Sequence, residues 1–107
     1  MTKYIIMVTI YALINPFNGL PFYVGQTGSL NYRLSMHLSD FMRRTSGNIK
    51  SYTKDRDNLI KSIRDHNIQL EAVALLVCPE TAAKKCEQYI CNLLRDNGYT
   101  LLQRKVV

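Results

Sequence analysis

Two tyrosines, an arginine and a glutamate are the side chains of this sequence whose types and spacing point to chemistry. Tyr11 and Tyr23 flank an Asn-Gly dipeptide at residues 18–19, a strong signal for a β-hairpin turn, so the hairpin should bring their rings together. Arg33 follows at the start of a segment with helical spacing, where its guanidinium would be able to contact a phosphate. Glu87 lies on an otherwise apolar helical stripe, and such a local inconsistency is typical of a functional site.

Each of these candidates also has an ordinary structural interpretation. Tyrosines in strands usually pack with a solvated hydroxyl, and a lone arginine or glutamate on a helix is usually a surface charge. His37 lies four residues after Arg33 and shares its helical face, so it is either a partly buried histidine with a structural partner or a catalytic or phosphate-binding group. The functional interpretation therefore depends on these residues occurring together.

The two tyrosines fall on a predicted pair of strands. Residues 3–14 are rich in β-branched and aromatic side chains and almost continuously apolar, which predicts a central strand covered on both faces. Residues 20–25 return as the second strand after the turn. Strand alternation places Met7, Thr9, Tyr11 and Leu13 on one face of the first strand, and on the second it places Tyr23 and Gly25 opposite Phe22 and Val24.

Helices and a third strand are predicted after the hairpin. They are a helix at 29–44, a loop at 45–53, a helix at 55–67, a strand at 68–77 and a helix at 79–97. Pro79 in the first turn of the last helix and Gly98 just beyond it mark the ends of that helix. The order β-β-α-α-β-α predicts an α/β (α+β) fold, formed by residues 1–107 as a single domain.

The charge of the chain favours a polyanionic partner. The formal net charge is +6, and a basic face raises the local concentration of phosphate-bearing ligands, nucleic acid first among them. The basic residues are unevenly distributed, because seven of them fall between positions 43 and 64 against two acidic ones. A solvated helix face is the ordinary interpretation of such a run. Its members are Arg43, Arg44, Lys50, Lys54, Arg56, Lys61 and Arg64.

Cysteine usage and hydropathy indicate the compartment. Cys78, Cys86 and Cys91 are odd in number and form no CxxC pair, which argues against a disulfide framework and a structural zinc site and favours a reducing compartment. The apolar run at residues 4–14 is shorter than the roughly 20 residues of a membrane helix and has no signal-peptide cleavage pattern. We therefore expect a soluble, intracellular, cytoplasmic protein.

In this order the residues resemble the GIY-YIG nuclease superfamily, and the resemblance covers almost the whole chain. The two name-giving triplets correspond to Thr9-Ile10-Tyr11 and Tyr23-Val24-Gly25, followed by the helix that carries arginine. The late segment from Glu87 to Gln103 resembles the family's glutamate, helix, glycine and terminal polar residue. Two positions differ from the family pattern: Thr9 stands in place of glycine, and Gln103 in place of the common asparagine.

The resemblance implies a small three-stranded antiparallel sheet flanked by helices, and a metal-dependent endonuclease that hydrolyses phosphodiester bonds in DNA. Glu87 would hold one Mg²⁺ or Mn²⁺ ion, whose other ligands are water and substrate. Tyr11 would act as general base on the attacking water or position it, with Tyr23 beside it. Arg33 would stabilise the phosphate, and His37 would complete the catalytic set. Since a free phenol has a pKa of about 10, a tyrosine base needs either a nearby metal or cation that favours the phenolate or a transient proton transfer toward the metal-bound alkoxide.

The same resemblance indicates where DNA and other partners would bind. A second copy of the chain or a larger protein would supply target specificity. Two other classes of function stay open: a catalytically inactive nucleic-acid-binding module of the same fold, and a protein-interaction domain whose basic face meets an acidic partner. The residues expected to contact DNA are Arg43, Arg44, Lys50, Lys54, Arg56 and Gln103.

Overall fold

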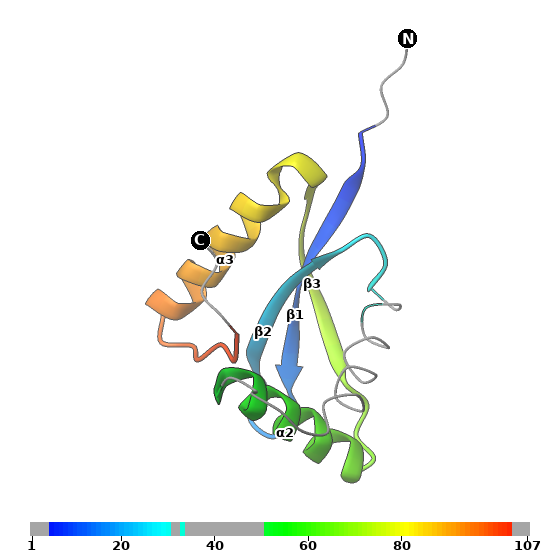
Figure 1. Cartoon of the computed structure of the whole chain (residues 1–107), viewed down its shortest axis with the longest axis vertical. Helices are drawn as coiled ribbons and strands as arrows, with labels where there is room; N and C mark the ends of the chain where they lie inside the picture. The colour runs from blue at the N-terminus through cyan, green and yellow to red at the C-terminus, as the bar shows by residue number, and fades with distance from the viewer. Residues whose placement is uncertain (1–4, 31–32, 34–50, 104–107) are drawn as a thin grey trace.

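A three-stranded antiparallel sheet in the order β2-β1-β3 forms the centre of the protein. The computed structural model describes residues 5–30, 33 and 51–103. The sheet and the helices around it confirm the predicted α+β class. The strands are β1 (Met7–Asn15), β2 (Leu20–Thr27) and β3 (Glu71–Pro79), and the helical elements are α2 (Ser51–Asp65), the 3-10 helix η1 (Glu80–Ala82) and α3 (Ala83–Asp96) (Figure 1).

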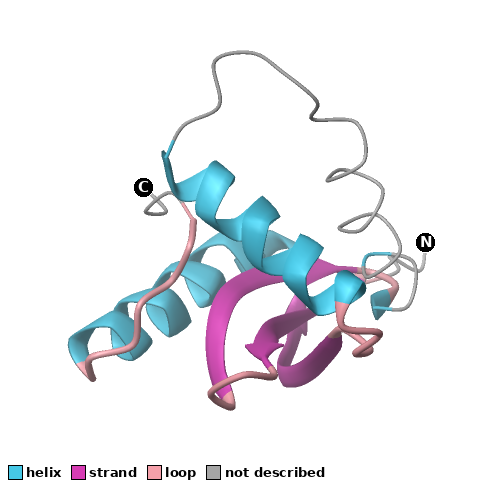
Figure 2. Cartoon of the chain, turned by 90° about the horizontal axis from the view of Figure 1, so that it is seen from below, coloured by secondary structure: helices cyan, strands magenta, loops and turns pink. Residues whose placement is uncertain are grey.

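β1 is the middle strand, as its continuous apolar sequence predicts. On one face of the sheet, Ile10 belongs to a buried cluster with Cys91 of α3. On the other face, Tyr11 belongs to a second cluster with Ile60 and Ile63 of α2. The alternation predicted along β1 is therefore confirmed, and the two helices lie against the strands as separate covers (Figure 2).

The hairpin between β1 and β2 contains a β-bulge that the sequence did not reveal. Leu13 pairs with Tyr23 and Ile14 pairs with Pro21, so Phe22 is the extra residue of β2. The bulge turns the Phe22 side chain into the cluster of Tyr11, where it is 3% exposed. The prediction that Phe22 shares a face with Val24 is therefore wrong, because strict alternation does not continue through a bulge.

The third strand begins later than predicted. The predicted strand covers residues 68–77, whereas β3 runs from Glu71 to Pro79. Its last pairing toward the hairpin is Glu71 with Ile14, one residue before β1 ends. Residues further back along the chain have no β1 partner, so residues 68–70 form the connection from α2 instead.

The two described helices have ends that backbone geometry explains. α2 begins at Ser51, within the predicted loop, and stops near Asn67, whose φ of 54° lies in the left-handed region that asparagine tolerates. α3 stops before Gly98, whose φ is 91°, and the amide of Tyr99 donates to the carbonyl of Leu94 at 3.0 Å. The predicted glycine stop is thus confirmed.

Part of the first predicted helix lies outside the described residues. Leu30 and Arg33 are helical, and the Arg33 amide donates to the Ser29 carbonyl at 3.1 Å, as a first helical turn requires. The rest of that helix and most of the predicted loop fall at positions the structure does not describe. Among the helices that are described, none has the length and apolar character needed to cross a membrane.

Candidate active site

The two tyrosines meet on the face of the sheet that α2 covers. Their ring centroids are 6.3 Å apart, with an angle of 38° between the ring planes. Tyr11 pairs with Gly25 across the two strands, and a Cβ at position 25 would lie 2.6 Å from the Tyr11 Oη and 2.8 Å from its Cζ. The Tyr11 ring therefore lies across the glycine backbone. This gives the glycine of the second triplet a packing reason: any side chain there would displace the first tyrosine.

Arg33 connects the two tyrosines from the start of the first helix. Its guanidinium hydrogen-bonds to the hydroxyls of both Tyr11 and Tyr23. Burial alone would lower the pKa of Arg33, but these two hydrogen bonds and the electron-rich oxygens outweigh burial, so the pKa is raised. Tyr11, Tyr23 and Arg33 thus form one hydrogen-bonded group, of which only the closeness of the two tyrosines was predicted from the hairpin.

A second cation approaches the tyrosines from α2. The guanidinium carbon of Arg56 lies 5.2 Å from the centroid of the Tyr23 ring, which is within the range of a cation–π contact. Arg56 was expected on the DNA-binding surface, and the structure places it beside the tyrosine pair. Lys54, two residues earlier, is exposed at the start of the same helix.

The Tyr11 phenol holds its proton more tightly than a free tyrosine. The side chain is fully buried, with 0% exposure. Burial is the main cause of its raised pKa, and the charge interactions with Tyr23 and Glu87 add to it, while Arg33 acts in the opposite direction. In the free protein the hydroxyl is therefore a neutral phenol that serves as a hydrogen-bonding group.

Glu87 lies on α3, in the layer that covers the opposite face of the sheet. The Nε2 of Gln26, near the end of β2, donates to Oε2 of Glu87 at 3.2 Å. Burial raises the pKa of the Glu87 carboxyl, and the Gln26 hydrogen bond partly offsets this effect. The charge of Glu87 is the smallest of the causes that raise the pKa of Tyr11, so the carboxylate lies within electrostatic range of that hydroxyl.

The donor atoms around Glu87 fit a hard divalent cation. Among the described residues Glu87 forms no ion pair, and its carboxylate is partly buried. Mg²⁺ prefers carboxylate oxygens, and the Gln26 side chain fixes this carboxylate by donating a hydrogen bond to it. In the described parts of the chain there is no group of three or more His, Cys, Asp or Glu side chains that would hold a metal. An ion would thus depend on one carboxylate and water.

Gln103 has a structural role that differs from the predicted DNA contact. β2 is an outer strand, so the backbone groups on its free edge need partners. The Gln103 amide supplies both for Val24: Nε2 donates to the Val24 carbonyl at 2.7 Å, and Oε1 accepts from the Val24 amide at 2.5 Å. Arg95 holds the segment by donating to the Gln103 carbonyl at 2.9 Å. These hydrogen bonds give the Gln103 amide a structural role, and its contact with DNA stays a prediction.

The remaining predicted residues divide into two groups. Thr9, which replaces the family's glycine, pairs with Thr27 on one side and Val77 on the other, so its β-branched side chain fits an unbroken sheet. Sequence reasoning did not select Gln26, although strand alternation puts it on the same face as Val24, which α3 covers. His37, Arg43, Arg44 and Lys50 lie outside the described residues.

Comparisons with known proteins find no relative of this chain. No protein-family model matches the chain, and no curated protein and no solved structure matches it either. The residues of the site themselves therefore carry the proposed function.

Proposed function

We propose that this chain is a metal-dependent endonuclease that hydrolyses phosphodiester bonds in DNA, with the site chemistry of the GIY-YIG superfamily. The observation that carries the proposal is the pair of hydrogen bonds from Arg33 to two tyrosine hydroxyls, with the charge of Glu87 in electrostatic range. A guanidinium held by two phenols suits a phosphate whose charge grows during attack, because arginine offers a planar fork of donors.

In this proposal the tyrosines orient the reacting groups. Their hydroxyls lie at one guanidinium, so a phosphate bound by Arg33 would lie beside both. Tyr11 keeps its proton in the free protein because burial raises its pKa. Its role as general base therefore requires that this pKa fall in the complex, where additional positive charge favours the phenolate.

Glu87 would hold one Mg²⁺ or Mn²⁺ ion in this proposal, with Gln26 fixing the carboxylate by its hydrogen bond. When bound, the ion supplies Lewis-acid stabilisation of the phosphate oxygens and the leaving group. Arg56 would add positive charge beside Tyr23, and exposed Lys54 would contact the DNA backbone. DNA is the expected partner because the chain carries a formal charge of +6.

Nicking of supercoiled plasmid in Mg²⁺ or Mn²⁺ tests the proposal. We expect open circles to form with either metal and not in EDTA, and we expect Glu87→Gln to abolish them. Glu80→Gln is the matched control, because Glu80 is an exposed glutamate on η1 and its replacement should leave nicking unchanged. No nicking with either metal, or undiminished nicking by Glu87→Gln, would refute the proposal.

A catalytically inactive DNA-binding module is the second candidate. One observation favours it: the Tyr11 hydroxyl is fully buried and its pKa is raised, both of which disfavour a base. On this alternative, salt-dependent DNA binding survives both EDTA and Glu87→Gln, while no metal produces nicking. The plasmid assay combined with a binding titration thus separates the two candidates.

A further inference from the structure

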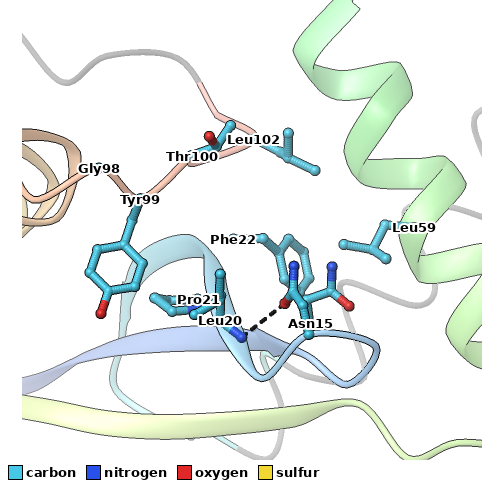
Figure 3. A pocket seen from close by; sticks show the side chains of 10 residues that line it. Asn15, Leu20, Pro21, Phe22, Leu59, Gly98, Tyr99, Thr100 and Leu102 are labelled. Carbon is cyan, nitrogen blue, oxygen red and sulfur yellow. Dashed lines mark hydrogen bonds between the residues drawn. The ribbon is translucent and has the colours of Figure 1, made fainter.

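A pocket of about 240 Å³ lies at the β1–β2 turn and takes no part in the proposed chemistry (Figure 3). It is formed by the β1–β2 turn, α2 and the segment that follows α3. Phe22 forms its floor together with Leu59 and Leu102, and the Tyr99 ring stands at one side. The Leu102 amide donates to the Phe22 carbonyl at 2.7 Å, so the segment after α3 is fastened to the floor.

The lining of the pocket selects an uncharged, flat ligand. None of its ten lining residues carries a charge, which disfavours a phosphate or a carboxylate. The volume exceeds the about 150 Å³ of an apolar cavity that holds benzene, and it is below the roughly 300–1,000 Å³ of drug-sized sites. A single nucleobase is a group of this size, and a partly exposed aromatic ring such as that of Tyr99 is the kind of surface on which unstacked bases pack.

Two asparagines give the pocket oriented polar groups. The Asn15 Oδ1 accepts from the Phe17 amide and the Asn18 Oδ1 from the Leu20 amide, each at 2.9 Å. These bonds fix both side-chain amides. Among residues 5–30, 33 and 51–103, neither Nδ2 donates a hydrogen bond. Each is a donor for the ring nitrogen or carbonyl acceptors on a base edge.

The pocket and Tyr23 lie close together along β2. Leu20 on its rim is three residues before Tyr23 on β2, which is about 10 Å at a strand rise of about 3.3 Å per residue. Phe22 on its floor is the neighbour of Tyr23 in the chain and shares the cluster that contains Tyr11. A DNA strand passing the tyrosines would reach the pocket within a few nucleotides, since stacked nucleotides are spaced by about 3.4 Å.

We propose that this pocket binds one unpaired nucleobase of the DNA that the tyrosine face engages. The proposal depends on the proposed function only in that DNA is the partner, and it deepens that function by naming the substrate class: DNA with an unpaired or extruded base near the cleaved phosphate. The bulged residue Phe22 connects the two sites, because it belongs to the Tyr11 cluster and also lines the pocket.

Fluorescence anisotropy in EDTA tests the proposal without cleavage. The probes are a labelled DNA hairpin with one unpaired adenine in its stem and the same hairpin with an abasic residue at that position, so that only the base differs. We expect at least fivefold tighter binding of the adenine probe, from stacking of one base on aromatic side chains. Leu20→Trp, which fills the pocket from its rim, should make the two affinities equal. Leu93→Trp is the matched control, because Leu93 on α3 is 44% exposed and Leu20 is 45% exposed.

The outcomes distinguish this proposal from the endonuclease proposal. Equal affinities of the wild-type protein for the two hairpins would overturn it, as would a preference that survives Leu20→Trp. Thr100→Trp, checked for folding by circular dichroism, repeats the test from the opposite wall if Leu20→Trp does not fold. A base preference without plasmid nicking supports the pocket and refutes the nuclease, whereas nicking without a preference refutes the pocket alone.

Discussion

Replacing Gly25 by alanine should break the contact that holds the first tyrosine in place. The added Cβ would lie 2.6 Å from the Tyr11 Oη and 2.8 Å from its Cζ, distances that real Cβ contacts do not show. The Tyr11 ring is fully buried and hydrogen-bonded to Arg33, so it has little room to move away. Forcing one extra carbon into such a core costs about 1–3 kcal/mol of unfolding free energy.

Urea unfolding of Gly25→Ala and Gly28→Ala measures this cost against a matched control. Gly28 has no heavy atom within 4 Å of the position of an added Cβ, so Gly28→Ala should change the free energy of unfolding by less than about 1 kcal/mol. Adding Tyr11→Phe to Gly25→Ala removes the closest clashing atom, and the cost of the alanine should fall by about 0.5 kcal/mol or more. Equal stability of the two alanine variants, or no relief from Tyr11→Phe, would refute the account of the tyrosine and glycine packing.

Three further predictions concern the groups around the tyrosines. Gln103→Ala removes two hydrogen bonds to the edge of β2 and should lower the free energy of unfolding by about 1–3 kcal/mol. Gln69→Ala, at an exposed glutamine, is the control and should have little effect. Similar losses for the two variants would contradict the pairing of Gln103 with the edge of β2. The folded-state pKa of Tyr11 is raised above its usual value of about 10, so the neutral phenol stabilises the fold below pH 10 and this stabilisation is lost as the pH rises further. In urea titrations the difference in unfolding free energy between wild type and Tyr11→Phe should therefore shrink between pH 9 and 11. A difference that stays constant would contradict the burial of the hydroxyl. Arg56→Ala should weaken DNA binding in EDTA and reduce by about 1 the slope of the logarithm of the binding constant against the logarithm of salt concentration. Lys84→Ala, on α3, should leave both the affinity and this slope unchanged. A larger effect of Lys84→Ala would place the DNA on the other face of the sheet.

Much of the fold was predictable because periodicity carries the information. The alternation along β1 separates Ile10 from Tyr11, and the two residues do belong to clusters on opposite faces. The Asn-Gly turn brings Tyr11 and Tyr23 together, and Gly98 ends the last helix. The helical stripe of α3 also placed Glu87 beside apolar residues, where its carboxylate is partly buried.

The features that could not be predicted from the sequence depend on the register of the strand pairing and on which strand lies at the edge of the sheet. Pro21 is the one signal next to the bulge, since a proline within a strand marks an edge or a bulge, but it does not say which residue is the extra one. The role of Gln103 depends on β2 being an outer strand with unpaired backbone at Val24, which is known only once the strand order is known. Gln26 meets Glu87 only because α3 lies across this end of β2, and no local pattern fixes that alignment.

The central claim is that Glu87 and the tyrosine pair form one metal-dependent site. Anomalous diffraction from a crystal soaked in Mn²⁺ tests it most directly, because the ion itself is located. The account predicts one strong peak within ligand distance of the Glu87 carboxylate, next to Gln26 and within reach of Tyr11 through water. A saturated soak with no peak at Glu87, or with the ion bound only elsewhere, would contradict it.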